Sequence, residues 1–300
     1  MSWDSVVIGA GPAGLSAALN LARSRRRVLV LDSNRPRNAA TFSAHGYLSR
    51  DGISPLELRR LGREELAAYP EAEYRKAAVS LVERDAAGPG FVVTLPGGVE
   101  RTRTVVIASG LTETFPALPG IRAFYGTSVH SCIACDAYDY AGQPIALVGE
   151  TDDLAYRALL LTQWSRDLIV FTNGVAVVSE ADEERLARRG VRVDRRPVQD
   201  LVGGHAGLTG ILMADGEVIS RTAAFVRPNW TPSLAFAVPL ELATTEVGLV
   251  AVDAGGRTSV PGVYATGDAV PLWRKQLIVA AGDGAKVADT LNRDLIEGED

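Results

Sequence analysis

The chain has 300 residues, of which 47% are hydrophobic and 22% charged, and its formal net charge at pH 7 is −5. This length suffices for two domains that each bury a core, and no uncharged apolar stretch approaches the roughly 20 residues of a membrane span, so we expect no membrane partner. The acidic balance argues against nucleic-acid binding, which needs a clustered basic face, and the absence of a secretory signal at the N-terminus predicts a cytoplasmic protein.

The predicted elements begin with a strand, a helix and a second strand. Residues 5–8 are apolar and strand-like, residues 12–26 carry helical periodicity, and residues 27–32 again resemble a buried strand. These three elements form a βαβ unit. Residues 54–69 are predicted to be helical. Three further strands are predicted around 79–82, 91–95 and 104–110.

A second βαβ unit starts at residue 143. Residues 143–149 predict a strand, residues 152–165 a helix, and residues 168–174 the next strand. A final strand within 260–270 precedes a helix over 277–295. Short strands are predicted between these parts, at 191–197, 210–216 and 223–228.

Two βαβ units with small strands around them predict an α/β fold of two Rossmann-like, three-layer domains. The last segment is expected to return to the first domain. The predicted discontinuous first domain therefore comprises 1–114 and 242–300, and the second comprises 115–241.

The first strand is followed by a glycine-rich turn. Gly9, Gly11 and Gly14 form a G-x-G-x-x-G pattern that opens the helix, and Asp32 ends the next strand. Gly9 permits the tight turn, Gly11 lets the backbone approach a pyrophosphate, and Gly14 allows close packing of helix on strand. The helix N-terminus offers free N–H groups to the anion, and Asp32 would accept ribose hydroxyls. The pattern predicts a dinucleotide site.

A second candidate motif, VYATGDAV, places Gly267 and Asp268 after an apolar strand. Together with the N-terminal glycines it resembles the second FAD motif of pyridine-nucleotide-disulfide-type flavoproteins. The resemblance implies FAD as cofactor, with Asp268 at its ribityl or phosphate portion. It also implies that the helix beginning at Gln276 and Leu277 faces the isoalloxazine C2 carbonyl. The remaining contacts implied are Pro12, Ala13, Asn38 and Val79.

The chain has two cysteines, Cys132 and Cys135, which stand two residues apart. In a reducing compartment such a pair is more often catalytic or metal-binding than a structural staple. At a helix N-terminus the pair would form a thiolate, the reactive species in disulfide exchange. Zinc needs about four ligands, and the three histidines supply no second paired motif, so we expect no metal. Two inert, buried thiols remain the other alternative.

The order GAGPAGL, CIACD, a second βαβ unit, ATGDAV and KQLIVAAGDGAKVA resembles the low-molecular-weight thioredoxin reductases over nearly the whole chain. The resemblance implies that Cys135 faces the flavin, that Cys132 exchanges with substrate and that Asp136 carries protons. His130 and His45 are alternative proton carriers, and His45 lies in the stretch AHGYLSRDG, where the family contacts flavin. A homodimer is also implied.

The second βαβ unit departs from these reductases at the turn that binds NADPH. Gly149 keeps the first position, but Thr151 and Leu154 replace the second and third small residues, and residues 172–174 replace the basic cluster for the 2′-phosphate. Three carboxylates surround the turn, on Glu150, Asp152 and Asp153. At about 6 Å and an effective dielectric of about 20, each would repel a phosphate charge by roughly 3 kcal/mol. Alternatively, the two aspartates cap a helix whose anion site is empty.

This departure resembles the thioredoxin-reductase-like dithiol oxidases of pathways to disulfide natural products such as gliotoxin and holomycin. The resemblance implies a small-molecule dithiol as substrate, oxygen as electron acceptor and hydrogen peroxide as product. Members of that branch often have His after the second cysteine, where this chain has Asp136. Two alternatives stay open: a reductase supplied by NADPH or ferredoxin with thioredoxin as substrate, and a non-enzymatic flavin-binding redox sensor.

Overall fold

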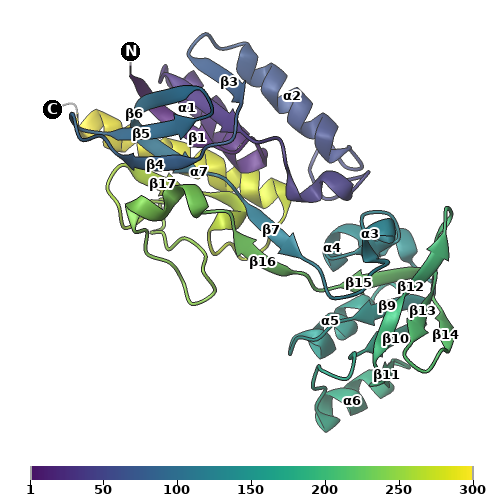
Figure 1. The fold of residues 1–300 in the computed structure, drawn as a ribbon. Helices are drawn as coiled ribbons and strands as arrows, with labels where there is room; N and C mark the ends of the chain where they lie inside the picture. The colour runs from purple at the N-terminus through teal and green to yellow at the C-terminus, as the bar shows by residue number, and fades with distance from the viewer. Residues whose placement is uncertain (1, 299–300) are drawn as a thin grey trace. The chain divides into compact units, whose positions relative to one another are not determined.

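The computed structural model describes residues 2–298, and the chain divides into two compact units (Figure 1). Unit 1 comprises Met1–Ala39, Gly46–Thr112 and Trp230–Asp300. Unit 2 comprises Ala40–His45 and Glu113–Asn229. Within residues 2–298, no helix combines the length and the apolar character needed to span a membrane.

A seven-stranded sheet forms the centre of unit 1. Its strands are β1 (Trp3–Ile8), β2 (Val28–Asp32), β3 (Ala72–Lys76), β4 (Leu81–Arg84), β5 (Phe91–Leu95), β6 (Gly98–Ile107) and β17 (Val263–Ala265). The order is β3-β2-β1-β6-β5-β4, with β17 also paired to β6. Strands β3, β2, β1, β6 and β17 run parallel, whereas β4 and β5 are antiparallel to their neighbours. β2 is buried at every residue, as expected for a parallel strand covered on both faces.

Helices cover one face of this sheet. They include α1 (Pro12–Arg23), α2 (Pro55–Ala67) and α7 (Leu277–Glu297), and short 3-10 turns lie at η1 (Arg37–Ala40), η3 (Ala235–Leu240) and η4 (Gly267–Ala269). α1 and α7 pack closely, because a Cβ added at Gly284 would lie 2.1 Å from the carbonyl oxygen of Ala13. On the opposite face, η3 contributes Phe236 and Leu240 to a second apolar cluster with the strands.

Unit 2 has its own parallel sheet. The strands are β8 (Val129–His130), β9 (Ile145–Val148), β10 (Leu168–Phe171), β11 (Arg192–Asp194) and β15 (Ala223–Val226), in the order β11-β10-β9-β15-β8. A separate antiparallel sheet joins β12 (Val198–Gly204), β13 (Gly207–Met213) and β14 (Val218–Ser220). The helical segments are α3 (Ile121–Phe124), α4 (Ile133–Asp136), η2 (Ala137–Tyr140), α5 (Leu154–Leu161) and α6 (Glu180–Ala187). The predicted α/β fold with two Rossmann-like domains is confirmed.

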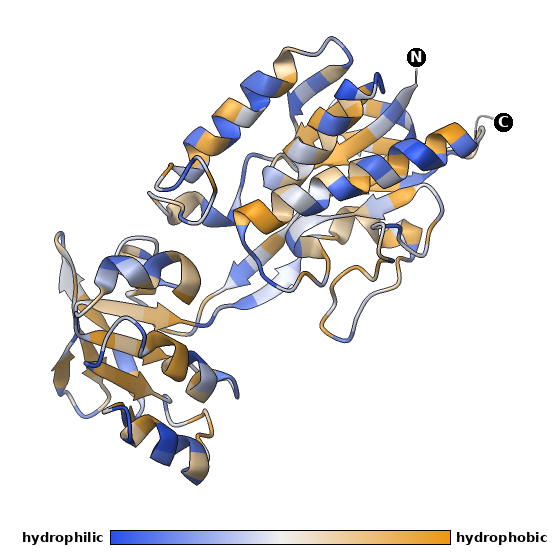
Figure 2. Ribbon diagram, turned by 180° about the vertical axis from the view of Figure 1, so that it is seen from behind, coloured by the Kyte–Doolittle hydropathy of each residue, from blue (hydrophilic) through white to orange (hydrophobic). Residues whose placement is uncertain are grey.

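Two apolar clusters cover the two faces of the parallel sheet in unit 2. One joins its strands to the antiparallel sheet and α3, and the other joins them to α5 and α6. Figure 2 shows the central strands as hydrophobic ribbon, whereas α2 in unit 1 alternates between hydrophilic and hydrophobic residues. The alternation is typical of a helix with one solvated face.

The chain passes between the units at four points, and two of them fall within the paired strands β7 (Leu111–Thr114) and β16 (Asn229–Pro232). At these strands the division falls at residues 112/113 and 229/230, whereas the sequence placed the boundaries at 114/115 and 241/242, and the segment Ala40–His45, predicted in the first domain, belongs to unit 2. The second difference has a packing reason: Phe236 and Leu240 already lie in the core of unit 1.

Candidate functional site

The glycine-rich turn lies between β1 and α1. Gly9 has a φ of +110°, and a Cβ there would lie 2.3 Å from the carbonyl oxygen of Ala108. A Cβ at Gly14 would lie 1.9 Å from the carbonyl oxygen of Gly9. In contrast, a Cβ at Gly11 would meet nothing within 4 Å. The turn therefore needs Gly9 and Gly14 for its own packing and leaves open space at Gly11, beside the N-terminus of α1, for an anionic ligand.

Asp32 lies at the end of β2, and only 7% of it is exposed. Its carboxylate accepts hydrogen bonds from the Ala10 N–H at 3.3 Å and from Arg59 Nη2 at 2.5 Å, and Tyr74 Oη lies 3.5 Å away. Arg59 also donates from Nε to the carbonyl oxygen of Ala10 at 3.1 Å. Burial, followed by the charge of Asp32, raises the pKa of Tyr74. Arg59 is thus buried and links the glycine-rich turn to Asp32 through hydrogen bonds. No sequence pattern had predicted this role.

Asp268 lies in η4, directly after β17. Its Oδ2 pairs with Arg37 Nη2 at 2.8 Å, whereas its Oδ1 is buried and has no hydrogen-bond partner among residues 2–298. Lys275 Nζ donates to the Asp268 carbonyl oxygen at 3.0 Å, and burial lowers the pKa of this lysine. A buried carboxylate oxygen without a partner is costly, so this atom suits a hydrogen bond from a ligand.

The two predicted cofactor motifs adjoin one another in unit 1. A Cβ at Gly267 would lie 2.7 Å from Ala13 Cβ on α1. Asp283 on α7 ties η4 in place, because its Oδ2 accepts from Thr266 Oγ1 at 2.7 Å and from the Gly267 N–H at 3.1 Å. The 21-residue helix α7 begins at Leu277, with Gln276 as its N-cap residue. Two helix N-termini and one unpaired carboxylate oxygen thus belong to the same unit.

The other predicted cofactor contacts take different positions in unit 1. Pro12 is the first residue of α1, and Ala13 follows it, buried. Asn38 lies in η1 beside Arg37, and Val79 is half-buried between β3 and β4, where it packs against the second apolar cluster. No pattern in the sequence had marked Arg37, whereas Lys275 and Asp283 lie in the stretch KQLIVAAGDGAKVA without having been assigned a role.

Cys132 and Cys135 form a disulfide in unit 2, with their Cα atoms 5.3 Å apart. Cys132 is the N-cap residue of α4, which spans only four residues. One carboxylate oxygen of Asp136 and the two sulfurs all lie within 4.8 Å of one another. The structure thus brings together three of the predicted catalytic residues, in an arrangement suited to thiol–disulfide exchange.

His130 stands at the end of β8 and is buried, with 7% exposure. Its Nδ1 lies 3.4 Å from Asp136 Oδ1, and its Nε2 lies 3.0 Å from Tyr140 Oη. Tyr140 Oη in turn contacts the carbonyl oxygen of Thr127. Burial, with further contributions from Asp136 and Asp139, raises the pKa of Tyr140. His130, the fourth predicted catalytic residue, therefore lies next to Asp136, which in turn lies near the two sulfurs.

His45, the fifth predicted catalytic residue, belongs to unit 2 through the segment Ala40–His45. Its Nε2 lies 3.3 Å from Asp139 Oδ2, and about a quarter of its side chain is exposed, at 26%. Asp139 lies in η2, the element that also carries Tyr140. His45 thus contacts the same short helix as His130 but pairs with a different carboxylate.

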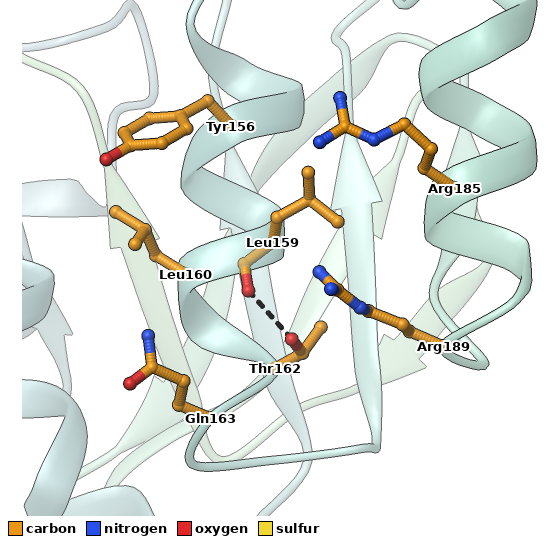
Figure 3. Close-up of a pocket in the computed structure, with 7 residues that line it drawn as sticks. All are labelled: Tyr156, Leu159, Leu160, Thr162, Gln163, Arg185 and Arg189. Carbon is orange, nitrogen blue, oxygen red and sulfur yellow. Dashed lines mark hydrogen bonds between the residues drawn. The ribbon is translucent and has the colours of Figure 1, made fainter.

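A second polar chain reaches the residue before Cys132. Tyr125 Oη lies 2.9 Å from Ser131 Oγ and 3.1 Å from Glu113 Oε2. Glu113 also lines a hollow of about 450 Å³ whose wall is largely apolar and includes Phe115. Figure 3 shows a different hollow, of about 420 Å³, between α5 and α6. Its lining residues are Tyr156, Leu159, Leu160, Thr162, Gln163, Arg185 and Arg189, and Thr162 Oγ1 donates to the Leu159 carbonyl oxygen at 2.7 Å.

The turn after β9 is filled by side chains. A Cβ at Gly149 would lie 2.8 Å from Leu154 Cδ1, and Leu154 is fully buried. Thr151 Oγ1 donates to Asp153 Oδ1 at 2.6 Å. Asp153 occupies the N-cap position of α5, but its side chain makes no capping hydrogen bond and instead pairs with Arg227 at 3.4 Å. The alternative interpretation was that Asp152 and Asp153 cap this helix. At Asp153 the structure does not show the capping hydrogen bond that this interpretation requires.

Side chains also make internal hydrogen bonds at the end of β10, the strand next to this turn. Asn173 follows β10 with a φ of +52°, donates from Nδ2 to Glu150 Oε1 at 2.6 Å and accepts from the Val198 N–H at 2.7 Å. Arg157 on α5 is buried and donates to the carbonyl oxygens of Ser131 and Val226. Burial, together with the nearby Arg227, lowers the pKa of Arg157 to about 10. Asn173, Glu150 and Arg157 thus already make hydrogen bonds within the unit, near the edge of the sheet where a nucleotide would be expected to bind.

Comparison with known proteins gives consistent matches. The family model described as pyridine nucleotide-disulphide oxidoreductase matches residues 3–284. A thioredoxin reductase of Aquifex aeolicus is 29% identical, over 95% of this chain and 91% of its own length. A probable thioredoxin reductase of Arthroderma benhamiae is 31% identical over 57% of this chain, and the match spans 44% of that relative's length. The crystal structure of HlmI superposes with a TM-score of 0.93 at 38% identity, covering 99% of this chain and 94% of HlmI.

Proposed function

The chain belongs to the pyridine nucleotide-disulphide oxidoreductase family, and we propose that within it this oxidoreductase is an FAD-dependent dithiol oxidase. Its substrate is a small-molecule dithiol, oxygen is the electron acceptor, and the products are a disulfide and hydrogen peroxide. The substrate loses two electrons and two protons, and oxygen gains both, so the overall reaction balances.

The residues of unit 1 fit FAD. The open space at Gly11 and the N-terminus of α1 suit its pyrophosphate, and the unpaired Asp268 Oδ1 suits a hydroxyl donor of its ribityl chain. The N-terminus of α7, at Gln276 and Leu277, supplies free N–H groups for a carbonyl oxygen. When bound, FAD would supply a two-electron acceptor for the reduced cysteine pair and pass the electrons to oxygen.

The cysteines carry the exchange with substrate. A substrate thiolate attacks the Sγ of Cys132, a new S–S bond forms, and the Cys132–Cys135 bond breaks with Cys135 leaving as a thiolate. The second substrate thiol, now a thiolate, then attacks the substrate sulfur that is bonded to Cys132. Cys132 leaves as a thiolate. The substrate leaves as a disulfide, and two electrons have passed to the cysteine pair. The two protons lost by the substrate thiols equal the two that the cysteine thiolates take up when both are protonated.

The filled turn after β9 is the observation that carries the oxidase assignment over a reductase supplied by NADPH. Leu154 occupies the space beside Gly149, and Asn173 links to Glu150 at the neighbouring strand. A carboxylate near a pyrophosphate adds repulsion of about 3 kcal/mol at roughly 6 Å. These contacts support the proposal that electrons enter through the cysteines rather than from a nicotinamide bound here.

The test is anaerobic stopped-flow absorbance of the FAD-loaded protein with NADPH and with dithiothreitol in separate runs. We expect dithiothreitol to bleach the flavin and NADPH to do so slowly or not at all. In air, the protein with dithiothreitol should consume oxygen and release peroxide. Cys132→Ser should abolish the oxygen consumption and the peroxide release. Rapid bleaching that saturates at micromolar NADPH would overturn the oxidase assignment.

A reductase is the second candidate, and Asp136 favours it. The dithiol oxidases that the sequence resembles often have His after the second cysteine, whereas thioredoxin reductases have an aspartate there, as this chain does. Bleaching by NADPH, or by reduced ferredoxin alone, followed by reduction of thioredoxin would support this candidate.

A further inference from the structure

The resemblance already implies that Asp136 carries protons for the Cys132–Cys135 disulfide. We propose that His130 shares its proton with Asp136, so that the two form one acid–base unit, and that Tyr140 is a positioning residue that fixes the proton on His130. The inference rests on the proposed thiol–disulfide chemistry. It does not depend on whether the electrons continue to oxygen, because both an oxidase and a reductase would use this disulfide.

Asp136, His130 and Tyr140 lie one after another between the disulfide and a backbone carbonyl oxygen. The carboxylate of Asp136 lies within 4.8 Å of both sulfurs, close enough for a proton to pass directly after a small movement or through one water. On its other side, Asp136 Oδ1 lies 3.4 Å from His130 Nδ1. The opposite ring nitrogen, Nε2, lies 3.0 Å from Tyr140 Oη, which contacts the Thr127 carbonyl oxygen.

The end of this line determines where the hydrogens are. A backbone carbonyl can only accept, so the Tyr140 hydroxyl donates its single hydrogen to Thr127. The phenol oxygen must then accept from His130, which requires a hydrogen on Nε2. Because burial and the nearby aspartates raise the pKa of Tyr140, its hydroxyl keeps this hydrogen throughout the neutral pH range. His130 is therefore held with Nε2 protonated.

The other ring nitrogen then faces Asp136 with a defined proton requirement. A bare Nδ1 and an ionised carboxylate oxygen would both present lone pairs across 3.4 Å, which is repulsive. One proton between them removes the repulsion, either as an imidazolium beside a carboxylate or as a neutral imidazole beside a carboxylic acid. The pair therefore stores one proton beside the disulfide, ready for a leaving thiolate.

The other groups packed around His130 do not take the place of Asp136 as its carboxylate partner. The ring packs against Tyr140 of η2, with centroids 5.3 Å apart, and against Phe225 of β15, with centroids 5.9 Å apart. On α5, Arg157 points its guanidinium at the carbonyl oxygens of Ser131 and Val226. Asp139 of η2 pairs with His45. Asp136 is thus the carboxylate that contacts His130.

The chemistry follows in two proton transfers. When substrate thiolate breaks the S–S bond, the stored proton passes through Asp136 to the Cys135 thiolate, leaving Asp136 ionised and His130 neutral. The second substrate thiol then gives its proton to the pair, which acts as a base, and its thiolate displaces Cys132. One proton is donated and one regained, so the pair ends this half-reaction as it began.

The first test reads the tautomer directly. The protein has three histidines, so long-range ¹⁵N–¹H spectra of the histidine-labelled, FAD-loaded, oxidised protein can be assigned with His45→Gln and His205→Gln. We expect His130 to carry hydrogen on Nε2, as the Nε2–H tautomer or as imidazolium. Tyr140→Phe should alter this pattern. A neutral Nδ1–H tautomer in the wild type would overturn the proposal.

The second test measures reduction of the disulfide by dithiothreitol, followed by acid quench, alkylation and mass spectrometry across about pH 5.5 to 9. His130→Gln and Asp136→Asn should each slow reduction at neutral pH by about 100-fold, and the double variant should be no slower than the worse single variant. Tyr140→Phe should slow it roughly threefold to tenfold and change the shape of the pH profile. Tyr138→Phe is the matched control, because Tyr138 lies in the same η2 and is 79% exposed.

The outcomes separate this proposal from the oxidase assignment. Failure to consume oxygen, with the expected tautomer and variant effects intact, would remove the oxidase and leave the acid–base unit standing. Multiplying effects of His130→Gln and Asp136→Asn, or a Tyr140→Phe protein indistinguishable from Tyr138→Phe, would overturn the acid–base unit while oxygen consumption continued.

Discussion

Gly11 differs from the two glycines beside it in the turn, because Gly9 and Gly14 are confined by backbone and Gly11 is not. A side chain at Gly11 therefore harms ligand binding without harming the fold. We expect Gly11→Asp to fold normally but to lose FAD, since it puts a carboxylate in the anion site. The measurement is the ratio of flavin to protein after denaturation, with circular dichroism to verify folding.

Gly88→Asp provides the matched control, because Gly88 also has open space around its Cα and lies in an exposed turn of unit 1. It should retain FAD at the wild-type ratio. Full flavin content in Gly11→Asp would show that the pyrophosphate does not lie at this turn.

The cysteines are expected to differ in their exchange with small thiols. Reduced Cys135→Ser protein treated with Ellman's reagent should retain a stable thionitrobenzoate adduct on Cys132, because no second thiol can displace it. In the wild type the adduct should be transient, and Cys132→Ser should react more slowly. Intact-mass spectrometry measures each species. Faster labelling of Cys135 than of Cys132 would reverse their assigned roles.

Candidate site residues could be predicted from the sequence where they belong to one short motif. Residues whose partners lie far away in the chain could not be predicted. Gly9, Gly11 and Gly14 are recognisable because their spacing follows from one turn. Arg59 and Arg37 are not, since each is recruited by a carboxylate far away in the chain, Asp32 and Asp268 respectively. The role that we propose for Tyr140 could not be predicted from the sequence either, because it depends on the position of the Thr127 carbonyl oxygen.

Among the elements, α6 illustrates a helix that the sequence analysis did not predict. Glu180–Ala187 has one buried residue, Leu186, and a largely charged surface, so it lacks the apolar periodicity that marked α1 and α7. β3 was missed for a related reason, since none of its residues is fully buried. The elements found correctly, such as β1, β9 and α7, are those with long apolar stripes or runs.

The start of α6 also gives a stability prediction. Ser179 is its N-cap residue, and the side chain accepts a hydrogen bond from the Asp182 N–H at 3.2 Å. We expect Ser179→Ala to lower the free energy of unfolding by about 1 kcal/mol. Ser54→Ala is the control, because Ser54 occupies the same position in α2 without a capping bond and should change it less. Urea denaturation measures both, and equal losses would contradict the cap.

The filled turn of unit 2 predicts a larger effect. Leu154 is fully buried and belongs to the apolar cluster between the sheet and α5, so Leu154→Ala should destabilise the protein by about 2–5 kcal/mol. Leu159→Ala, on the partly buried side of α5, should cost less. Guanidinium unfolding followed by far-ultraviolet circular dichroism is the measurement. A loss under about 1 kcal/mol at Leu154 would mean that the side chain does not fill the turn.

At the scale of the whole molecule, we keep the expectation of a homodimer. Large apolar side chains are exposed at Phe42, Leu48 and Trp273, with 75%, 85% and 78% of their surfaces accessible. Self-association would remove such surface from water. Sedimentation velocity at micromolar concentration should therefore give twice the chain mass of 31.8 kDa. A species at the chain mass across that range would remove the dimer.

The paired strands β7 and β16 have a consequence for how such a protein can diversify. Where the chain leaves unit 1 and where it comes back are neighbours, since Thr112 Oγ1 lies 2.9 Å from Ser233 Oγ and the Ser233 N–H donates to Gly110 at 3.4 Å. Genetic recombination at these two points would exchange residues 113–229 without cutting the central sheet of unit 1, and would leave the segment Ala40–His45 of unit 2 in place. Such an exchange would keep the glycine-rich turn and Asp268 while it replaced the segment that carries Cys132 and Cys135.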